Sequence, residues 1–185
     1  MIGIFIVAIT TDNIFFVGLM GAGKTTIGKL LAKHLGRTFY DTDHEIEKRT
    51  GVKISTIFEL EGELGFRNRE TAIIQELSQL NSIVMATGGG AILAQENRQL
   101  LLTNGMVIYL RANVNELWHR MRYDKHRPLL QNVDIRAKLE HLYAERNPLY
   151  TETAALIFDT GSQSVANILN QIENALLKKS LKVLP

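Results

Sequence analysis

One stretch of the chain has the residue types and the spacing to bind a nucleoside triphosphate. Residues 18–26 read GLMGAGKTT, which satisfies G-x-x-x-x-G-K-[S/T] between an expected strand and an expected helix. The glycines let successive backbone N–H groups face one anion, and the helix N-terminus adds a positive field. Lys24 can then reach the β- and γ-phosphates, and the Thr25 hydroxyl can bind Mg²⁺. The other predicted contacts in this phosphate loop are Gly21, Ala22, Gly23 and Thr26.

Two acids provide a second set of chemical groups. Asp41 and Asp43 end an expected strand, where the side-chain period of two would project both carboxylates the same way. A cation that bridges phosphates needs hard oxygen ligands, and an attacking alcohol needs a carboxylate to hold its hydroxyl and accept its proton. Two acids with these two tasks favour a kinase that acts on a small hydroxylated molecule.

Three consecutive glycines follow another expected strand. Gly88, Gly89 and Gly90 come after Ile83–Ala86 and would lie beside the phosphate loop at the carboxyl edge of the sheet. Glycines in such a turn leave room for a close approach, so we expect something other than backbone to contact them.

Arginines form the third set. Arg67, Arg120, Arg127 and Arg146 carry planar guanidinium groups that suit carboxylates and phosphates. Between Arg120 and Arg127, four basic residues accompany a single acid. We predict that residues 122–134 form a lid that closes over the transferring phosphate and excludes water.

The apolar pattern predicts a parallel α/β fold that would position these residues. Short β-branched runs alternate with longer amphipathic stretches, as in successive βαβ units. The expected strands are 13–17, 38–41, 83–86, 106–110 and 156–158. The expected helices are 27–35, 55–60, 63–79, a helix opened by a capping box of Asn113 and Glu116, a helix from Ile135 that Pro148 closes, and 165–177.

Composition excludes several classes of protein. The 185 residues, 45% hydrophobic and 22% charged, fit one domain, assigned here to residues 13–185, after an apolar extension at 1–12. The net charge of +2 gives no indication of nucleic-acid binding, and the absence of cysteine excludes disulfides and thiol chemistry. The apolar run 2–9 is too short for a membrane span and has no basic segment before it, so we expect neither a signal peptide nor a membrane partner.

The phosphate loop alone leaves several nucleotide-dependent activities open. The chain has no N-K-x-D guanine signature, no strand that ends in the paired acids of a typical Walker B motif, and no room for a motor's coupling domain. A metabolic kinase is therefore the favoured class.

Taken together, the motifs resemble those of shikimate kinases in order and spacing, over roughly residues 13–160. They are GLMGAGKT (18–25), DTD (41–43), EIE (45–47), FRNRE (66–70), TGGG (87–90), RPLL (127–130) and RNPLY (146–150). The resemblance implies a three-layer α/β P-loop fold with a five-stranded parallel sheet in the order 2-3-1-4-5, flanked by helices, with a lid and a substrate-binding helical region. It also implies transfer of phosphate from ATP to the 3-hydroxyl of shikimate, in the route to aromatic amino acids.

The resemblance also implies roles for individual residues. Asp43 would hold the shikimate hydroxyls and act as the base, while Arg67 and Arg146 grip the carboxylate and Glu70 orients Arg67. Gly88 to Gly90 would close the pocket. The remaining implied roles are an apolar wall from Phe58 and Phe66, Mg²⁺ binding by Thr25 and through water by Asp41, cover of the transferring phosphate by Arg127, and adenine contact by Arg120.

Two other functions remain open at this point. One is a kinase for another sugar acid such as gluconate, and the other is a catalytically silent nucleotide-binding regulator. The family resemblance further implies a cytoplasmic monomer.

Overall fold

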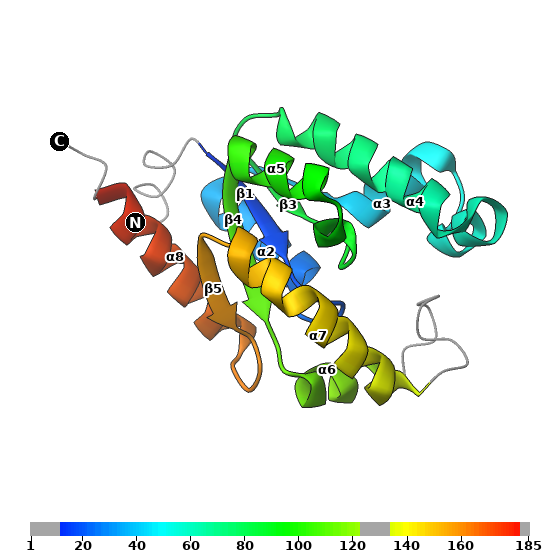
Figure 1. Cartoon of the computed structure of the whole chain (residues 1–185). Helices are drawn as coiled ribbons and strands as arrows, with labels where there is room; N and C mark the ends of the chain where they lie inside the picture. The colour runs from blue at the N-terminus through cyan, green and yellow to red at the C-terminus, as the bar shows by residue number, and fades with distance from the viewer. Residues whose placement is uncertain (1–11, 123–133, 182–185) are drawn as a thin grey trace.

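A computed structural model describes residues 12–122 and 134–181. Its centre is a five-stranded sheet in the order β2-β3-β1-β4-β5, with every neighbouring pair parallel (Figure 1). The strands are β1 (Asn13–Val17), β2 (Thr38–Asp41), β3 (Ile83–Ala86), β4 (Gly105–Arg111) and β5 (Leu156–Asp159). The predicted strands and their order are therefore confirmed, with β4 and β5 slightly longer than expected.

Helices cover both faces of this sheet. The helices α2 and α8 pack on one face, and α4, α5 and α7 cover the other (Figure 1). Their bounds are α2 (Lys24–Leu35), α3 (Thr42–Thr50), α4 (Ile54–Ser78), α5 (Gln95–Asn104), α6 (Val114–Met121), α7 (Ile135–Thr153) and α8 (Val165–Leu181), with a short 3₁₀ helix, η1, at Ala91–Leu93.

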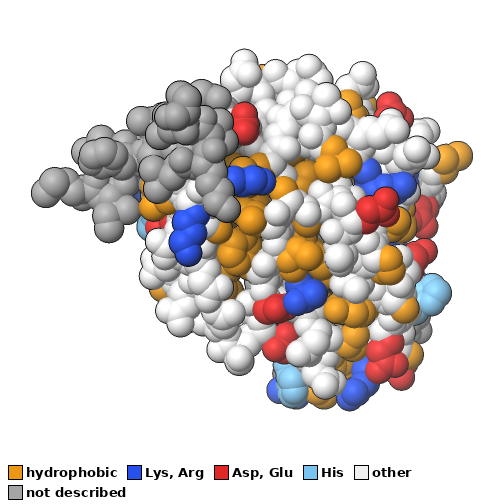
Figure 2. All heavy atoms as spheres, turned by 60° about the vertical axis from the view of Figure 1, so that its left-hand side comes forward, with side chains coloured by type: hydrophobic (Ala, Val, Ile, Leu, Met, Phe, Trp, Pro, Cys, Tyr) orange, Lys and Arg blue, Asp and Glu red, His pale blue; other side chains and the backbone are white. Residues whose placement is uncertain are grey.

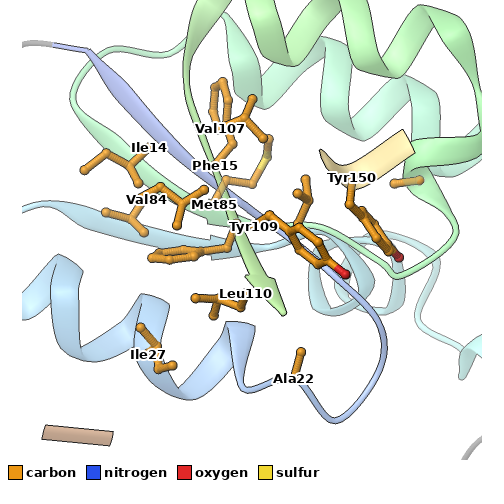
Figure 3. Packing of buried hydrophobic residues seen from close by; sticks show 14 of the residues in the cluster. Ile14, Phe15, Ala22, Ile27, Val84, Met85, Val107, Tyr109, Leu110 and Tyr150 are labelled. Atoms are coloured by element: carbon orange, nitrogen blue, oxygen red, sulfur yellow. The ribbon is translucent and has the colours of Figure 1, made fainter. Parts of the chain in front are cut away.

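The core lies along the three central strands. Every residue of β1 and β3 is buried, and so is β4 between its end residues, because helices cover both sides of each strand. The edge strands β2 and β5 are only partly buried. Figure 3 shows the resulting cluster, which extends from Ile14 and Val84 to Tyr109 and Tyr150 near the phosphate loop. A rigid core thus supports the carboxyl edge of the sheet.

Pro148 does not close its helix as predicted, because α7 continues to Thr153. Proline removes one N–H donor from a helix and usually ends it. Here the turn beyond it is held by packing, since Tyr150 and Thr153 are buried, and by the hydroxyl of Thr153, which donates to Leu149 O at 2.7 Å. Tertiary contacts therefore override the local signal.

The apolar pattern did not predict two of the helices, α3 and α5. Only Thr42 and Ile46 are buried in α3, and only Asn97 and Leu101 in α5, so neither helix carries a clear apolar stripe. The helix α3 is instead defined by its ends, with Asp41 as the N-terminal cap and Gly51 in the left-handed region at φ 72°.

Charges are dispersed over the described part of the face shown in Figure 2. Acidic and basic side chains lie near one another there, with apolar side chains between them. Several of the exposed charges are paired, for example Arg111 with Asp159 at 2.6 Å and Arg49 with Glu76 at 2.6 Å. The net charge of +2 is thus the difference between 21 basic and 19 acidic residues, and both kinds are present on this face.

A buried asparagine ties together the end of the sheet opposite the phosphate loop. The Asn13 side chain donates to Ser78 O, Leu80 O and Asn104 O, and its Oδ1 accepts from the Ile83 N–H at 3.0 Å. One side chain thus contacts backbone groups of four residues, at the ends of α4 and α5, in the loop after α4 and at the start of β3.

Replacing this side chain should destabilise the fold without disturbing the opposite edge. We expect Asn13→Ala to lower the free energy of unfolding by about 2–4 kcal/mol, because it leaves buried backbone groups unpaired. Urea denaturation would measure the loss, with Asn170→Ala, an exposed asparagine on α8, as the control. Equal stabilities of the two variants would contradict this interpretation of Asn13.

Candidate active site

The phosphate loop has the backbone that its sequence predicts. Gly18, Gly21 and Gly23 have φ values of 140°, 78° and 97°, a region in which other residues are strained, and α2 begins directly at Lys24. The Lys24 ammonium donates to Gly18 O at 2.7 Å and to Leu19 O at 3.0 Å. Residues 21–26 therefore form the end of the loop and the first turn of α2, and the Lys24 side chain bends back to contact the start of the loop.

Asp41 faces this loop. Its Oδ2 accepts a hydrogen bond from the Thr25 hydroxyl at 2.6 Å, and its Oδ1 accepts from the N–H groups of Asp43 and His44. The carboxylate thus caps α3 with one oxygen and joins the phosphate loop with the other. The two residues predicted to serve Mg²⁺ are in direct contact.

The predicted reason for the pairing of Asp41 and Asp43 is wrong. The strand ends at Asp41 and a helix begins at Thr42, so the side-chain period of two does not apply across the three residues. While Asp41 turns to Thr25, Asp43 Oδ1 lies 2.9 Å from the position that a Cβ on Gly88 would occupy. The two acids therefore face neighbouring parts of the site.

Arg67 is held by two carboxylates on its own helix. Its Nη1 donates to Glu70 Oε2 at 2.7 Å, and its Nη2 donates to Glu63 Oε1 at 3.0 Å. The expected contact with Glu70 is present, and the contact with Glu63 was not predicted. These bonds fix the guanidinium at the mouth of the site, where 19% of the Arg67 side chain remains exposed.

Glu70 and Arg146 form the buried end of the site. Both are almost fully buried, and neither Glu70 Oε1 nor Arg146 Nη1 has a hydrogen-bond partner among the described residues. Burial raises the pKa of Glu70 to about 7, although the positive charges of Arg67 and Arg146 oppose the shift. Buried polar atoms are costly when unpaired, so these two mark a place where a polar ligand would be stabilising.

The glycine turn, Gly88–Gly90, lies between the phosphate loop and these charged groups. A Cβ on Gly90 would lie 2.2 Å from Arg67 Nη2, and one on Gly88 would lie 2.3 Å from Glu70 Oε1. On the other side, a Cβ on Gly89 would lie 3.4 Å from the backbone nitrogen of Met20 in the phosphate loop. As predicted, groups other than backbone approach the turn, and they are the protein's own arginine and glutamate side chains.

An aromatic pair lies next to Arg67. The rings of Phe58 and Phe66 are 4.8 Å apart, and the Arg67 guanidinium carbon lies 5.2 Å from the centre of the Phe66 ring. The two phenylalanines lie on either side of Gly62, whose φ of 69° and ψ of −175° interrupt α4. This break separates the two helices predicted at 55–60 and 63–79, and it brings the expected apolar wall together.

Arg120 joins α6 to two loops. Its guanidinium donates to Gly21 O at 2.9 Å, to Gly161 O at 2.9 Å and to Thr160 O. The helix α6 starts with the predicted capping box of Asn113 and Glu116. Residues 160–161 therefore border the phosphate loop, a position that the sequence motifs did not predict. Arg127, most of the predicted lid and nearly all of the N-terminal extension lie outside the described residues.

Two further observations concern membranes and metals. None of the helices within 12–122 and 134–181 combines the length and the apolar character needed to cross a membrane. Over the same ranges, no three histidine or acidic side chains gather in a way that could hold a metal ion.

The sequence comparisons decide which family this arrangement belongs to. A family model described as shikimate kinase matches residues 20–177. The chain belongs to the shikimate kinase family. A shikimate kinase from Thiobacillus denitrificans is 60% identical over 85% of this chain and 86% of its own length, and one from Burkholderia lata is 58% identical over 86% and 87%.

Comparison with solved structures supports the same family assignment. A shikimate kinase from Acinetobacter baumannii in complex with shikimate is 46% identical, with a TM-score of 0.90 over 94% of this chain and 97% of that protein. A gluconokinase from Sinorhizobium meliloti reaches a TM-score of 0.58 at 16% identity over 94% of this chain and 95% of that protein, which shows likeness of fold alone. Members of the shikimate kinase family are thus similar to this chain in both sequence and fold.

The buried glutamate of the site should make stability depend on pH. The ordinary pKa of the Glu70 carboxyl is 4.5 and its folded value is about 7, so between these values the folded chain binds a proton that the unfolded chain has released. This group therefore makes the free energy of unfolding fall as pH rises from about 5 to 7, by at most about 3 kcal/mol.

The substitution Glu70→Gln should remove this contribution. Urea denaturation of ligand-free protein at several pH values would compare the two chains, and the wild-type protein should lose stability relative to the variant as pH rises. Parallel curves for the two proteins would contradict the raised pKa.

Proposed function

We propose that this chain transfers the γ-phosphoryl group of ATP to the 3-hydroxyl of shikimate, giving shikimate 3-phosphate and ADP. The observation that carries the proposal is the position of the glycine turn, with the phosphate loop on one side and Arg67, Glu70 and Asp43 on the other. A nucleotide and a carboxylated polyol can then meet across one short segment of backbone. Membership of the shikimate kinase family supports the same reaction.

We assign recognition of the acceptor to the two arginines. An anionic substrate carboxylate would pair with Arg67 at the mouth of the site and with the Arg146 Nη1 that has no partner among the described residues. Glu70 would keep the Arg67 guanidinium in place through its 2.7 Å bond. The ring of Phe66, beside Phe58, would supply apolar contact for the carbon ring of the substrate.

We assign the proton to Asp43. In this mechanism the hydroxyl oxygen attacks the γ-phosphorus, the bond to the oxygen that bridges the β- and γ-phosphorus breaks, and the hydroxyl proton passes to the Asp43 carboxylate. Lys24 would leave the loop carbonyls that it now contacts and would stabilise charge on the β- and γ-phosphates. The N–H groups of the phosphate loop, between Gly21 and Thr26, would hold the same phosphates in line with the acceptor.

The residues beside the phosphate loop fit Mg²⁺. Thr25 and Asp41 bring a hydroxyl and a carboxylate oxygen to within 2.6 Å of each other, and Mg²⁺ in kinase sites binds one or two such protein oxygens together with substrate phosphates. When bound, Mg²⁺ would neutralise part of the charge that the β- and γ-phosphates carry. We propose Thr25 as a direct ligand and Asp41 as a ligand through water.

Several finer points belong to this proposal and rest on the resemblance to the family. Arg120 would lie against the adenine, and Arg127, in the lid at about 122–134, would cover the transferring phosphate.

The chain would act as a cytoplasmic monomer with a single kinase domain at residues 13–185. Light scattering after gel filtration would test whether the protein is a monomer.

A coupled assay of ADP release tests the acceptor. Shikimate should support turnover, and gluconate at the same concentration should not. Turnover with gluconate alone would replace this proposal by the sugar-acid alternative, and binding of shikimate without ADP release would favour a silent regulator.

Loss of one arginine should separate the two substrates. We expect Arg67→Ala to raise the KM for shikimate about 30-fold or more, because a charged hydrogen bond to the substrate carboxylate is lost, and to leave the KM for ATP within about twofold. The control is Arg69→Ala, which removes an exposed arginine that pairs with Glu61 on the same helix. If ATP binding collapsed in Arg67→Ala, the placement of Arg67 on the acceptor side would be wrong.

Loss of the phosphate-loop lysine should act mainly on the rate. We expect Lys24→Ala to lower kcat about 10²-fold or more, because a positive group aimed at the β- and γ-phosphates stabilises the transition state. The matched control is Lys29→Ala, a lysine later in α2. Steady-state kinetics would measure both variants, and an unchanged kcat in Lys24→Ala would exclude the assigned role.

A further inference from the structure

We propose that the hydroxyl groups of Thr42 and Tyr150 fix the Gly88–Gly90 turn and thereby set the distance between the acceptor-binding side chains and the phosphate loop. We call this pair of hydrogen bonds the turn clamp. The inference rests on the proposed function, and it adds two positioning residues that do not themselves touch the substrates.

Thr42 holds the turn from the side of β2. Its Oγ1 accepts the Gly88 N–H at 3.0 Å, and the residue is fully buried. Thr42 is the first residue of α3 and lies between Asp41 and Asp43 in the chain. The bond therefore ties the turn to the helix end that carries both acids of the site.

Tyr150 holds the turn from the side of α7. Its hydroxyl donates to Gly89 O at 2.5 Å, and its ring stacks on that of Tyr109 at 4.9 Å, deep in the core (Figure 3). Burial raises the pKa of the Tyr150 phenol above its ordinary value, so the hydroxyl keeps the proton that it donates. One helical turn earlier, α7 carries Arg146, so this bond ties the turn to the second arginine of the site.

The space around the turn explains why its position matters. A Cβ on Gly90 would lie 2.2 Å from Arg67 Nη2, and a Cβ on Gly88 would lie 2.3 Å from Glu70 Oε1. Both charged groups therefore pack directly against the backbone of the turn. On the other side, Gly89 is in ordinary van der Waals contact with the phosphate loop, since its Cβ would be 3.4 Å from Met20 N and 3.6 Å from Gly18 O. A shift of the turn would therefore move the acceptor side chains relative to the phosphates.

Kinetics of matched variants test the clamp. Thr42→Val and Tyr150→Phe each remove one hydroxyl and keep most of the side-chain volume. We expect each to raise the KM for shikimate about three- to tenfold, the effect of one lost hydrogen bond, and to leave the KM for ATP within about twofold. Thr42→Ser keeps the acceptor oxygen and should restore the wild-type KM for shikimate.

The control separates positioning from stability. Thr153→Val removes a buried hydroxyl from α7 that donates only within its own helix, to Leu149 O. It should lower the melting temperature without changing either KM. If Thr42→Val and Tyr150→Phe lowered the melting temperature in the same way and left the KM for shikimate unchanged, the clamp would be a structural feature only and the proposal would be overturned.

Hydrogen exchange in the ligand-free protein provides a test that does not depend on the reaction. In Thr42→Val, the Gly88 amide should exchange about tenfold faster than in the wild-type protein, while amides in the centre of β1 keep their rates. Unchanged exchange at Gly88 would overturn the clamp even if shikimate were phosphorylated. Faster exchange at Gly88 in a chain that did not phosphorylate shikimate would leave the clamp intact and reject the proposed function.

Discussion

Close packing around one glycine turn is the constraint on which the site depends. The turn follows β3, and the neighbouring strands β1 and β2 deliver the phosphate loop and Asp41 to the same edge of the sheet. Because the strands are parallel, their carboxyl ends meet there, and ligands of open α/β sheets bind in this crevice. A side chain on Gly88 or Gly90 would displace the Glu70 carboxylate or the Arg67 guanidinium from its position, so the glycines let these groups pack directly against the backbone of the turn.

The charges beyond the turn are costly without a ligand. Glu70 is buried beside Arg67, Arg146 and Asp43, and burial outweighs its positive neighbours in setting its pKa. Removing these charges from water costs free energy, and the attraction between them does little more than offset that cost. A functional site can retain such a cluster because an incoming carboxylate would give Arg146 Nη1 the hydrogen-bond partner that it lacks among the described residues. The cost in the free protein is thus connected to recognition of the acceptor.

The sequence predicted much of the fold and several of the contacts within the candidate site. The five strands follow from β-branched runs that end in turns, whereas their order was implied only by the resemblance to shikimate kinases. The phosphate loop, the pair of Arg67 and Glu70, and the glycine turn come together as the motifs indicate. The helix α3 was not predicted, because its start depends on a cap at Asp41 instead of an apolar stripe, and for the same reason the two acids do not share a strand face.

Other features could not be read from local patterns. Pro148 lies inside α7 because long-range packing of Tyr150 holds the helix beyond it, and the bonds from Thr42 and Tyr150 to the turn span 46 and 61 residues of chain. A hydroxyl whose partner is a distant backbone group leaves no spacing signal. The contact of Arg120 with residues 160–161 is of the same kind.

The account depends on one cleft in which nucleotide and acceptor lie on either side of the glycine turn, and a crystal structure with shikimate and a non-hydrolysable ATP analogue tests it most directly. The account predicts that the carboxylate of shikimate lies between Arg67 and Arg146, that its 3-hydroxyl faces Asp43, and that the γ-phosphate lies above the phosphate loop. A complex in which shikimate contacts neither Arg67 nor Asp43 would contradict it.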